Sequence, residues 1–428
     1  MGATPKALSS YRWYVLFMIT LVTTFSYLDR QLIVILQESI KAEMGLSDTQ
    51  LGLVTGLAFA LSFTVFGIPV AHLADRYNRK NIIGIALAFW SSITAFTGFA
   101  NNFWQLFLAR FGVGLGETGS APPALSILPD YFPKNERGRA FAIRGMGVYF
   151  GLLLGFLIGG FLEEAYGWRT AFWVVGLPGI IFSILFYYTV KEPQRGSLDG
   201  QYDNNQKKAT LKEALYTILK KKTLLYMMLG SGLHALVGTA YATWMPPFFA
   251  RIHGMGTAEI GLWLAFAIGV CGAFGTFLGG YIGDQLGKKD VRWYLWMSAI
   301  SFAFSFPFVI GLLFSTQKYT ALLFYLMPNV LYAFYIGPSY TILQDLVEVR
   351  IRATANAVFV TFISLCGVGT GPFLTGIISD WLAPTYGVDS LRWALLAVGS
   401  LEWVAIICLL LAARSLKKDL ANTKYSVH

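Results

Sequence analysis

The sequence predicts an all-α membrane protein with twelve transmembrane helices, arranged as two six-helix bundles related by pseudo-symmetry. The first observation is composition: 55% of the 428 residues are hydrophobic and 13% are charged, whereas soluble domains average about 25% charged residues. The second is a series of apolar runs of membrane-spanning length, about 20 residues each. The third is a pair of motifs that occurs once in each half of the chain. Lipid is therefore expected to surround most of the protein.

Twelve apolar runs are candidate spans. They lie near 13–36, 51–73, 81–100, 104–128, 140–161 and 170–190 in the first half, and near 224–250, 258–282, 292–314, 320–343, 353–378 and 391–413 in the second. These limits predict an N-terminal bundle (1–190), a cytoplasmic linker (191–222) and a C-terminal bundle (223–428). The linker is polar, and its stretch TLKEALYTILKK can form a short amphipathic surface helix or stay a solvated linker.

Basic residues orient the chain. Of the 33 Lys and Arg residues, 26 lie on the side of the N-terminus, five lie on the opposite side, and Arg30 and Arg110 lie within spans. The positive-inside rule then places both termini in the cytoplasm. The same rule accounts for the net charge of +10, so we expect no nucleic-acid partner. The short loops suit a bacterial inner membrane, and a monomer surrounded by membrane lipids is expected.

No cofactor, metal or enzymatic site is expected. The three cysteines lie inside apolar runs without metal-ligand spacing. A GxGxxG pattern at 114–119 lies in an apolar span followed by Pro122 and Pro123, whereas a dinucleotide site needs a preceding strand. The four histidines are scattered along the chain, so a membrane enzyme acting on lipid is disfavoured.

Two motifs recur between the halves. The loop after span two reads AHLADRYNRK (71–80) and the loop after span eight reads GYIGDQLGKK (280–289), at an offset of 209. Span four ends PALSILPD (123–130) and span ten ends PSYTILQD (338–345), at an offset of 215. The basic pairs that follow, Arg137 with Arg139 and Arg350 with Arg352, indicate a slip to 213. The halves are therefore predicted to be parallel structural repeats.

These loops predict a gate on the cytoplasmic side. Each tight turn needs a residue that tolerates left-handed φ, which Asn78 and Gly287 supply. The loop Asp can cap a helix or pair with Arg, in contacts that exist only while that side is shut. A plain positively charged loop is the alternative. The expected gate residues are Asp75, Arg76, Arg79, Lys80, Arg137, Arg139, Asp284 and Lys288.

These segments resemble the major facilitator superfamily. Its loop pattern, Gly-x-Leu-x-Asp-Arg-x-Gly-Arg-Lys, is matched from Leu73 to Lys80 but departs at Ala71 and Asn78. Its span-four pattern, Arg-x-x-x-Gly-x-Gly, is similar to Arg110–Gly116, and span five carries a glycine ladder at 147, 151, 155 and 159. The resemblance implies the major facilitator fold and secondary transport by alternating access, with substrate bound near the midplane between the halves.

Two shorter segments are similar to the spinster branch of that superfamily. They are Tyr27–Gln31 (YLDRQ) and Gly114–Glu117 (GLGE). This branch includes lysophospholipid and sphingolipid-phosphate transporters and their bacterial relatives, so the resemblance implies an amphipathic, lipid-like substrate. A small organic anion or a drug is the alternative, because related bacterial carriers of organic acids share similar segments.

Four ionisable residues lie at bilayer depth, where a charge costs a few kcal/mol and marks function by default. Helix rise places Asp29 and Arg110 at similar depths, so they can pair, and Glu117 lies two turns along the same face from Arg110. We expect Asp29 and Glu117 to exchange protons, and Arg30 and Arg110 to balance charge or to bind an anionic head group. A permanent charge network that locks the helices together is the alternative.

The second half lacks these charges and offers aromatic residues instead. Together with Tyr27 in span one, the residues expected to line a cavity are His234, Tyr241, Trp244, Tyr325, Tyr332, Tyr335 and Tyr340. An ionic wall and an aromatic wall suit an amphipathic substrate. For each single aromatic residue, ordinary packing is the favoured interpretation, and it is favoured for His234 over proton transfer. Glu402 and Asp380 are expected near span ends, where water or head groups reach them, and no role is assigned to them.

Overall fold

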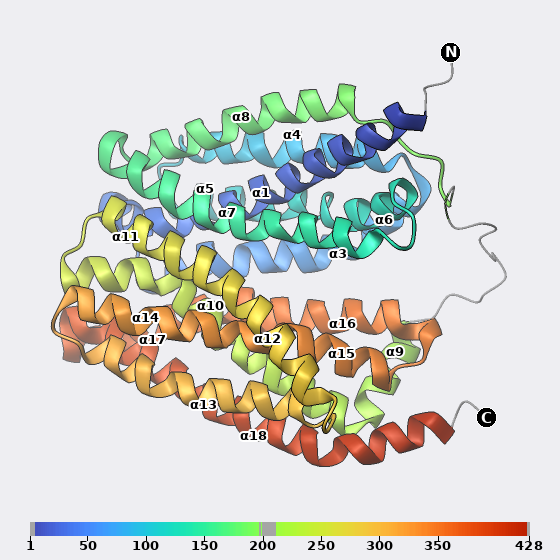
Figure 1. Cartoon of the computed structure of the whole chain (residues 1–428). Coiled ribbons are helices and arrows are strands. Elements are labelled where there is room, and N and C mark those ends of the chain that lie inside the picture. The colour runs from blue at the N-terminus through green and yellow to red at the C-terminus, as the bar shows by residue number, and fades with distance from the viewer. Residues whose placement is uncertain (1–4, 197, 199–210, 426–428) are drawn as a thin grey trace. The chain divides into compact units, whose positions relative to one another are not determined.

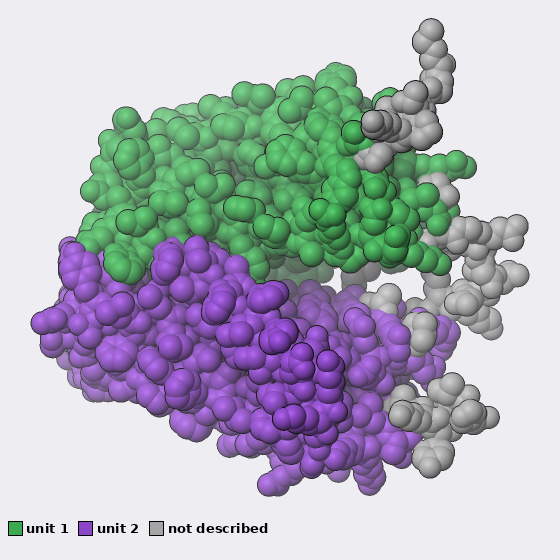
Figure 2. All heavy atoms as spheres, viewed as in Figure 1, with its two compact units in different colours: residues 1–46, 58–205, 256–265 green, residues 47–57, 206–255, 266–428 purple. Residues whose placement is uncertain are grey.

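The computed structural model describes residues 5–196, 198 and 211–425, which form helices joined by short turns, with no strand among them (Figure 1). The chain divides into two compact units. Unit 1 comprises residues 1–46, 58–205 and 256–265, and unit 2 comprises 47–57, 206–255 and 266–428 (Figure 2). The predicted limits of 1–190 and 223–428 stay a prediction, since each unit also contains a short segment of the other half.

Unit 1 is a bundle of long apolar helices. Its helices are α1 (Pro5–Met44), α3 (Ala58–Arg76), α4 (Arg79–Thr97), α5 (Phe103–Glu117), α6 (Ala121–Tyr131), α7 (Arg137–Tyr166), α8 (Trp168–Thr189) and α11 (Thr257–Leu264). Within it, α1 packs along α7, α4 packs along α8, and α5 lies against α3 and α4. The two helices that carry the four predicted charges, α1 and α5, therefore each pack against other helices of the unit.

Unit 2 contains the start of span two, the linker helix and the helices of the second half other than α11. They are α2 (Asp48–Gly52), α9 (Leu211–Lys220), α10 (Lys222–His253), α12 (Gly272–Gly287), α13 (Trp293–Phe314), α14 (Lys318–Tyr332), α15 (Ile336–Leu346), α16 (Arg352–Ser364), α17 (Gly371–Tyr386) and α18 (Ser390–Tyr425). Short 3-10 segments cover Ala333–Tyr335, Val349–Ile351 and Gly387–Asp389. In this unit α10 packs along α18, and α13 packs on both α14 and α18.

Several predicted spans are interrupted helices. One π-helical segment occurs in each of three spans: Leu53–Leu57 between α2 and α3, Ala265–Cys271 between α11 and α12, and Leu365–Thr370 between α16 and α17. Such π-bulges are frequent at functional sites. By length and composition, nine described stretches could cross a membrane, and one of them, Thr354–Asn422, includes parts of two predicted spans. The number twelve therefore stays a prediction that agrees with this arrangement.

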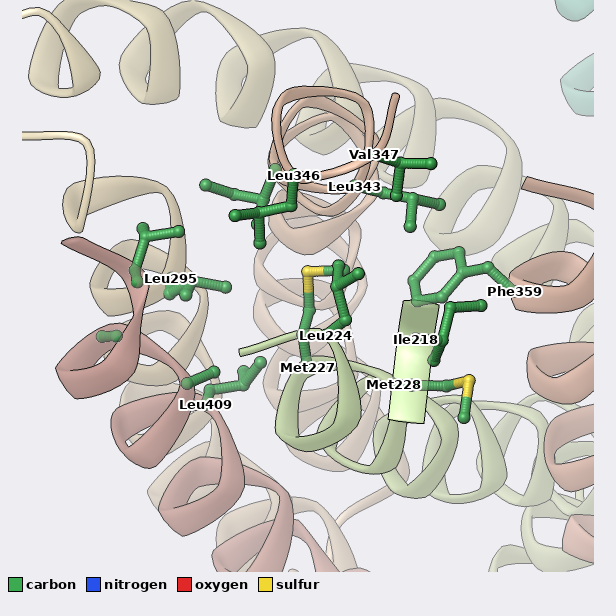
Figure 3. Close-up of a cluster of buried hydrophobic side chains, with 14 of the residues drawn as sticks. Ile218, Leu224, Met227, Met228, Leu295, Leu343, Leu346, Val347, Phe359 and Leu409 are labelled. Carbon is green, nitrogen blue, oxygen red and sulfur yellow. The ribbon is translucent and has the colours of Figure 1, made fainter. Parts of the chain in front are cut away.

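The amphipathic stretch of the linker is a helix that packs on unit 2. Ala214 and Ile218 of α9 are buried in an apolar cluster with Met228, Leu343 and Phe359 (Figure 3). The opposite side of α9 carries exposed Lys212 and Lys220. The structure thus favours the surface helix over a solvated linker, because the buried face removes apolar side chains from water.

Glycines let α7 approach α1 at backbone distance. A Cβ added at Gly151 would lie 2.6 Å from the carbonyl oxygen of Thr24, and one at Gly155 would lie 2.7 Å from Cβ of Gln31. Contacts this short do not occur between real Cβ atoms, so any larger residue pushes the helices apart. The ladder therefore fixes the position of the α1 turn that carries Asp29 and Arg30.

We predict that Gly155→Ala destabilises the protein by about 1–3 kcal/mol, the usual cost of overpacking a close contact. Gly145→Ala on the same helix is the matched control, because nothing lies within 4 Å of its added Cβ. That control is expected to be neutral or to gain about 0.5–1 kcal/mol from helix propensity. Thermal unfolding of the purified protein in detergent measures both, and equal midpoints for the two variants would contradict the prediction.

Candidate functional site

Four charged side chains from α1 and α5 meet in the interior of unit 1. Asp29 and Arg110 are each 2% exposed and Glu117 is fully buried. Arg30 is the accessible member, with 22% of its side chain exposed. Because two acids and two bases are gathered together, the group is neutral overall when all four are ionised, which limits the cost of burying them.

Arg30 pairs closely with Glu117. Arg30 Nε donates to Glu117 Oε2 at 2.7 Å, and Arg30 Nη2 lies 2.6 Å from the same oxygen. Ser26, one turn before Arg30 on α1, donates its hydroxyl to the same oxygen at 2.6 Å. The other oxygen, Oε1, is buried without a hydrogen-bond donor. Glu117 is therefore held through one of its two oxygens.

Asp29 pairs more loosely with Arg110. The shortest distance between them is 3.9 Å, from Nη1 to Oδ1. Asp29 Oδ1 has no hydrogen-bond donor and Arg110 Nε has no acceptor, although both atoms are buried. Thr94 of α4 donates to the other oxygen, Oδ2. This geometry makes an ion pair without a hydrogen bond, so protonation of Asp29 breaks no close contact with Arg110.

Aromatic rings surround the partly exposed guanidinium of Arg30. The Arg30 guanidinium lies 4.4 Å from the ring centroid of Phe59, 4.7 Å from that of Tyr27 and 5.5 Å from that of Phe63. Arg110 lies 5.8 Å from the Phe59 ring. Cation–π contacts of this kind stabilise a guanidinium away from bulk water. Tyr27, expected to line a cavity, therefore packs on Arg30 within unit 1.

The aromatic residues of the second half occupy several sites within unit 2. Tyr241, Tyr325 and Tyr332 line a cavity of about 60 Å³ together with Asn329 and apolar side chains. Trp244 is buried and donates its indole N–H to the carbonyl oxygen of Pro372 at 2.9 Å. Tyr335 packs on the ring of His234, and Tyr340 packs on Phe359. The seven predicted side chains thus do not share one surface.

Glu402 is the buried acid that sequence reasoning missed. It lies within α18, is 1% exposed, and contacts His234 Nδ1 through Oε1 at 2.6 Å. The expectation that water reaches it near a span end is wrong. The signal available in the sequence was its position inside the run 391–413, at bilayer depth. Asp380 likewise has a structural role, because it accepts the backbone N–H groups of Asp48 and Thr49 at 3.0 and 2.7 Å.

At the end of unit 1 where α1 begins, Arg79 forms a second ionic group. Its guanidinium contacts Asp130 Oδ2 and Glu192 Oε1, both at 2.7 Å, and it is 2% exposed. Arg79 Nη1 also donates to the carbonyl oxygen of Ser126 at 2.9 Å. The group therefore joins the start of α4, the end of α6 and the segment that follows α8.

The other predicted gate residues differ in exposure. Arg76 and Arg139 are exposed, and Arg139 lies over the ring of Trp13. Lys80 Nζ donates to the carbonyl oxygen of Tyr187 at 2.9 Å. In unit 2, Asp284 and Lys288 are both exposed, and Asp284 accepts from Tyr294 Oη at 3.2 Å. The side chain of Asp75 lies outside what the structure describes.

Comparison with known proteins decides the family. The sequence model described as Major Facilitator Superfamily matches residues 19–369. The chain belongs to this superfamily. Among the parts of the chain that are described, no group of three or more His, Cys, Asp or Glu residues is arranged to hold a metal ion.

The relatives of this major facilitator protein include bacterial and vertebrate proteins. It is 31% identical to an "MFS-type efflux pump" of Mycolicibacterium smegmatis, over 95% of this chain and 94% of that protein. It is 27% identical to the "Probable galactarate/D-glucarate transporter GudP" of Bacillus subtilis, over 96% and 93%. It is also 27% identical to "Protein spinster homolog 1" of Xenopus laevis, over 93% and 78%.

A solved structure confirms the fold and the spinster resemblance. It is the crystal structure of a bacterial homolog of the human lysosomal transporter Spinster, described as inward-facing and unoccupied. It matches with a TM-score of 0.89 and 30% identity, covering 98% of this chain and 99% of that one. The predicted major facilitator fold is therefore confirmed, and the chain is an integral, multi-pass transporter of that family.

Two details of the major facilitator motifs differ from the sequence prediction. Neither Asn78 nor Gly287 has left-handed φ. Asn78 is extended (φ −66°), and its side chain caps α4 by accepting a hydrogen bond from the backbone N–H of Asn81. Gly287 is the last residue of α12. Gly287 is needed for another reason, because an added Cβ would lie 2.6 Å from the Tyr294 ring. A larger residue at this position would therefore displace the Tyr294 ring, which is a packing effect rather than a requirement of turn geometry.

The offset of 215 residues between the two halves continues through the basic residues that follow spans four and ten. Arg137 begins α7 and donates to the carbonyl oxygen of Phe132, and Arg352 begins α16 and donates to that of Val347. The two bonds match at an offset of 215, so Arg137 corresponds to Arg352, and the pairing at 213 is wrong. The side chain is placed to satisfy a carbonyl that the end of the preceding helix leaves unpaired.

We predict that Arg79→Gln destabilises this major facilitator protein by about 3–5 kcal/mol, because it leaves the buried carboxylate of Asp130 without its guanidinium. Lys288→Gln, the matched change at the corresponding position of the second half, is expected to stay within about 0.5 kcal/mol since Lys288 is exposed. Denaturant or thermal unfolding in detergent measures the difference. An Arg79→Gln protein as stable as Lys288→Gln would show that the ionic group contributes nothing to the fold.

Proposed function

We propose that this major facilitator protein is a proton-coupled secondary transporter that works by alternating access and moves an amphipathic, lipid-like substrate such as a lysophospholipid or sphingolipid. The observation that carries the proposal is the buried group of Asp29, Arg30, Arg110 and Glu117. A neutral set of four charges inside a membrane bundle is costly to maintain and is retained where ions or charged substrates are handled.

Proton coupling is assigned to Asp29 and Glu117. Asp29 has a buried oxygen without a donor and a partner 3.9 Å away, so it takes up a proton without losing a hydrogen bond to Arg110. Glu117 accepts hydrogen bonds from Arg30 and Ser26, so its protonation weakens more interactions than protonation of Asp29 does. Protonation of Glu117 is therefore expected when Arg30 is drawn to an anionic substrate, which couples substrate binding to proton binding.

The substrate assignment rests on Arg30 and on the relatives. Arg30 is the partly exposed cation of the group, and aromatic rings surround it, which suits a phosphate head group beside hydrocarbon. The likeness to spinster proteins supports a lipid-like substrate. A small organic anion or a drug is the second candidate, favoured by the relatives that are named galactarate/D-glucarate transporter and efflux pump.

The proposal includes the membrane in which the protein lies and its orientation there. Twenty-six of the 33 basic residues lie on one side of the predicted spans, which supports cytoplasmic termini. Bacterial relatives over nearly the whole chain support a bacterial inner membrane. A monomer surrounded by membrane lipids is part of the same proposal.

Asp29→Asn and Glu117→Gln test the proton role. Each variant keeps the shape of the side chain but carries no exchangeable carboxyl proton, so we predict at least a tenfold loss of substrate-driven proton flux in proteoliposomes, the usual scale for loss of a proton-transfer group. Asp389→Asn, a change to an exposed carboxylate, is the control. Undiminished pH dependence in both Asp29→Asn and Glu117→Gln would leave the group as a permanent lock between helices.

A thermal-shift comparison separates the two substrate classes. Lysophosphatidylglycerol is expected to raise the unfolding midpoint of the wild type as its concentration increases. At 100 times its Kd, bound ligand adds about 2.7 kcal/mol to the free energy of unfolding. Monoacylglycerol of the same chain length controls for detergent effects, and D-glucarate is the competing ligand. The shift should vanish in Arg30→Gln. A shift with D-glucarate alone would replace the lipid by the small anion.

A further inference from the structure

Unit 2 contains a buried acid–base pair that the four-charge group does not include. His234 of α10 is 2% exposed and Glu402 of α18 is 1% exposed. His234 Nδ1 lies 2.6 Å from Glu402 Oε1, and its other ring nitrogen, Nε2, lies 3.1 Å from the carbonyl oxygen of Tyr332. The imidazole stacks on Phe302 with ring centroids 3.7 Å apart and planes 7° from parallel.

From this geometry we propose that His234 and Glu402 form a second proton-binding site, whose proton holds α10, α18 and the break in span ten together. The ligand is a proton, and the site is separate from the group in unit 1. The inference does not rest on the proposed function, because proton binding by the pair is measurable without any transport.

Counting hydrogens shows that the contact requires a bound proton. A carbonyl oxygen can only accept, so Nε2 must carry a hydrogen. The 2.6 Å contact between Nδ1 and Oε1 must then hold a second proton, as an imidazolium with a carboxylate or as a neutral imidazole with a carboxylic acid. Both forms are neutral overall. Loss of that proton leaves one hydrogen for two contacts, so either a nitrogen lone pair faces the carboxylate or the Tyr332 carbonyl loses its donor.

The surroundings favour the form of the His234–Glu402 pair in which the second proton is bound. The titratable groups that face the pair are phenols: Tyr241 on α10, Tyr332 on α14 and Tyr335 on the 3-10 segment. Phe302 of α13 covers one ring face, and among the described residues no Lys or Arg forms an ion pair with Glu402. Glu402 Oε2 is buried without a donor. An uncompensated carboxylate here is costly, so a neutral pair is stable and its deprotonated form is not.

The pair acts on a break in a helix. Span ten changes from α14 to α15 through Ala333–Tyr335, so the Tyr332 carbonyl lies where regular helical bonding ends, and His234 satisfies it. Tyr332 also lines the cavity of about 60 Å³, as does Gly238, one turn after His234 on α10. Deprotonation of the pair therefore releases a constraint on the break and on one wall of that cavity.

Ordinary packing explains the pair less well. Replacing a buried ionic pair by apolar residues is often neutral or stabilising, so packing alone does not call for an acid and a base in this core. The acid, the base and the freed carbonyl come from three separate helices and meet within hydrogen-bond distance. Such convergence is what a binding site for a proton requires.

The test is 15N-histidine NMR of the full-length protein in detergent micelles. The chain has four histidines, and His234→Gln assigns the signal of residue 234. In the wild type we expect Nε2 to stay protonated while the Nδ1 signal shifts as pH rises from about 5 to well above 6.5, the ordinary histidine value. A His234 signal that does not change over this range would overturn the proposal.

Glu402→Gln is the matched variant. Its amide can donate to Nδ1 of a neutral imidazole, so the contact is kept while the exchangeable proton is lost. We expect the pH-dependent shift of the His234 signal to disappear. We also expect the unfolding midpoint to depend less on pH than in the wild type, because the folded variant no longer binds that proton. An identical titration in Glu402→Gln would also overturn the proposal. If this variant does not fold, the wild-type titration decides by itself.

Discussion

The neutralisation of buried charge in pairs is the constraint on which unit 1 depends. Two acids and two bases lie on α1 and α5, and each pair joins these two helices. Neither helix can rotate or slide by one residue without leaving a charge unpaired in an apolar interior, which costs several kcal/mol. Thr94 of α4 and the rings of α3 complete the same group, so four helices share one electrostatic requirement.

Close backbone packing makes this arrangement possible. Side chains as short as Asp29 reach a partner on another helix only when the helix axes are near one another. Gly151 and Gly155 bring α7 against the turn of α1 that carries the charges, and Gly114 brings α5 against Phe59 and Ser62 of α3. The glycine patterns of the superfamily therefore have a direct mechanical meaning here, because they set the separation at which the ion pairs form.

The two halves share a scaffold and differ in the chemistry placed on it. Glu117 ends α5 before a break in span four, and the corresponding residue at offset 215, Tyr332, ends α14 before the break in span ten. In the first half a side-chain carboxylate at the break is bound by α1. In the second half a backbone carbonyl at the break is bound by His234 of α10. Helix breaks expose polar groups in both halves, and different partners satisfy them.

The sequence by itself determined the helical membrane fold, the repeat and the buried charges, because each depends on apolar length, residue spacing or the cost of an ion in lipid. It also predicted the pairing of Asp29 with Arg110, since both depths follow from helix rise. Only the tertiary structure decided that Arg30 pairs with Glu117, that Arg79 joins three segments, and that Glu402 meets His234. Those contacts depend on the rotation of each helix about its axis and on the distance between axes, and the packing of side chains around the whole bundle sets both quantities.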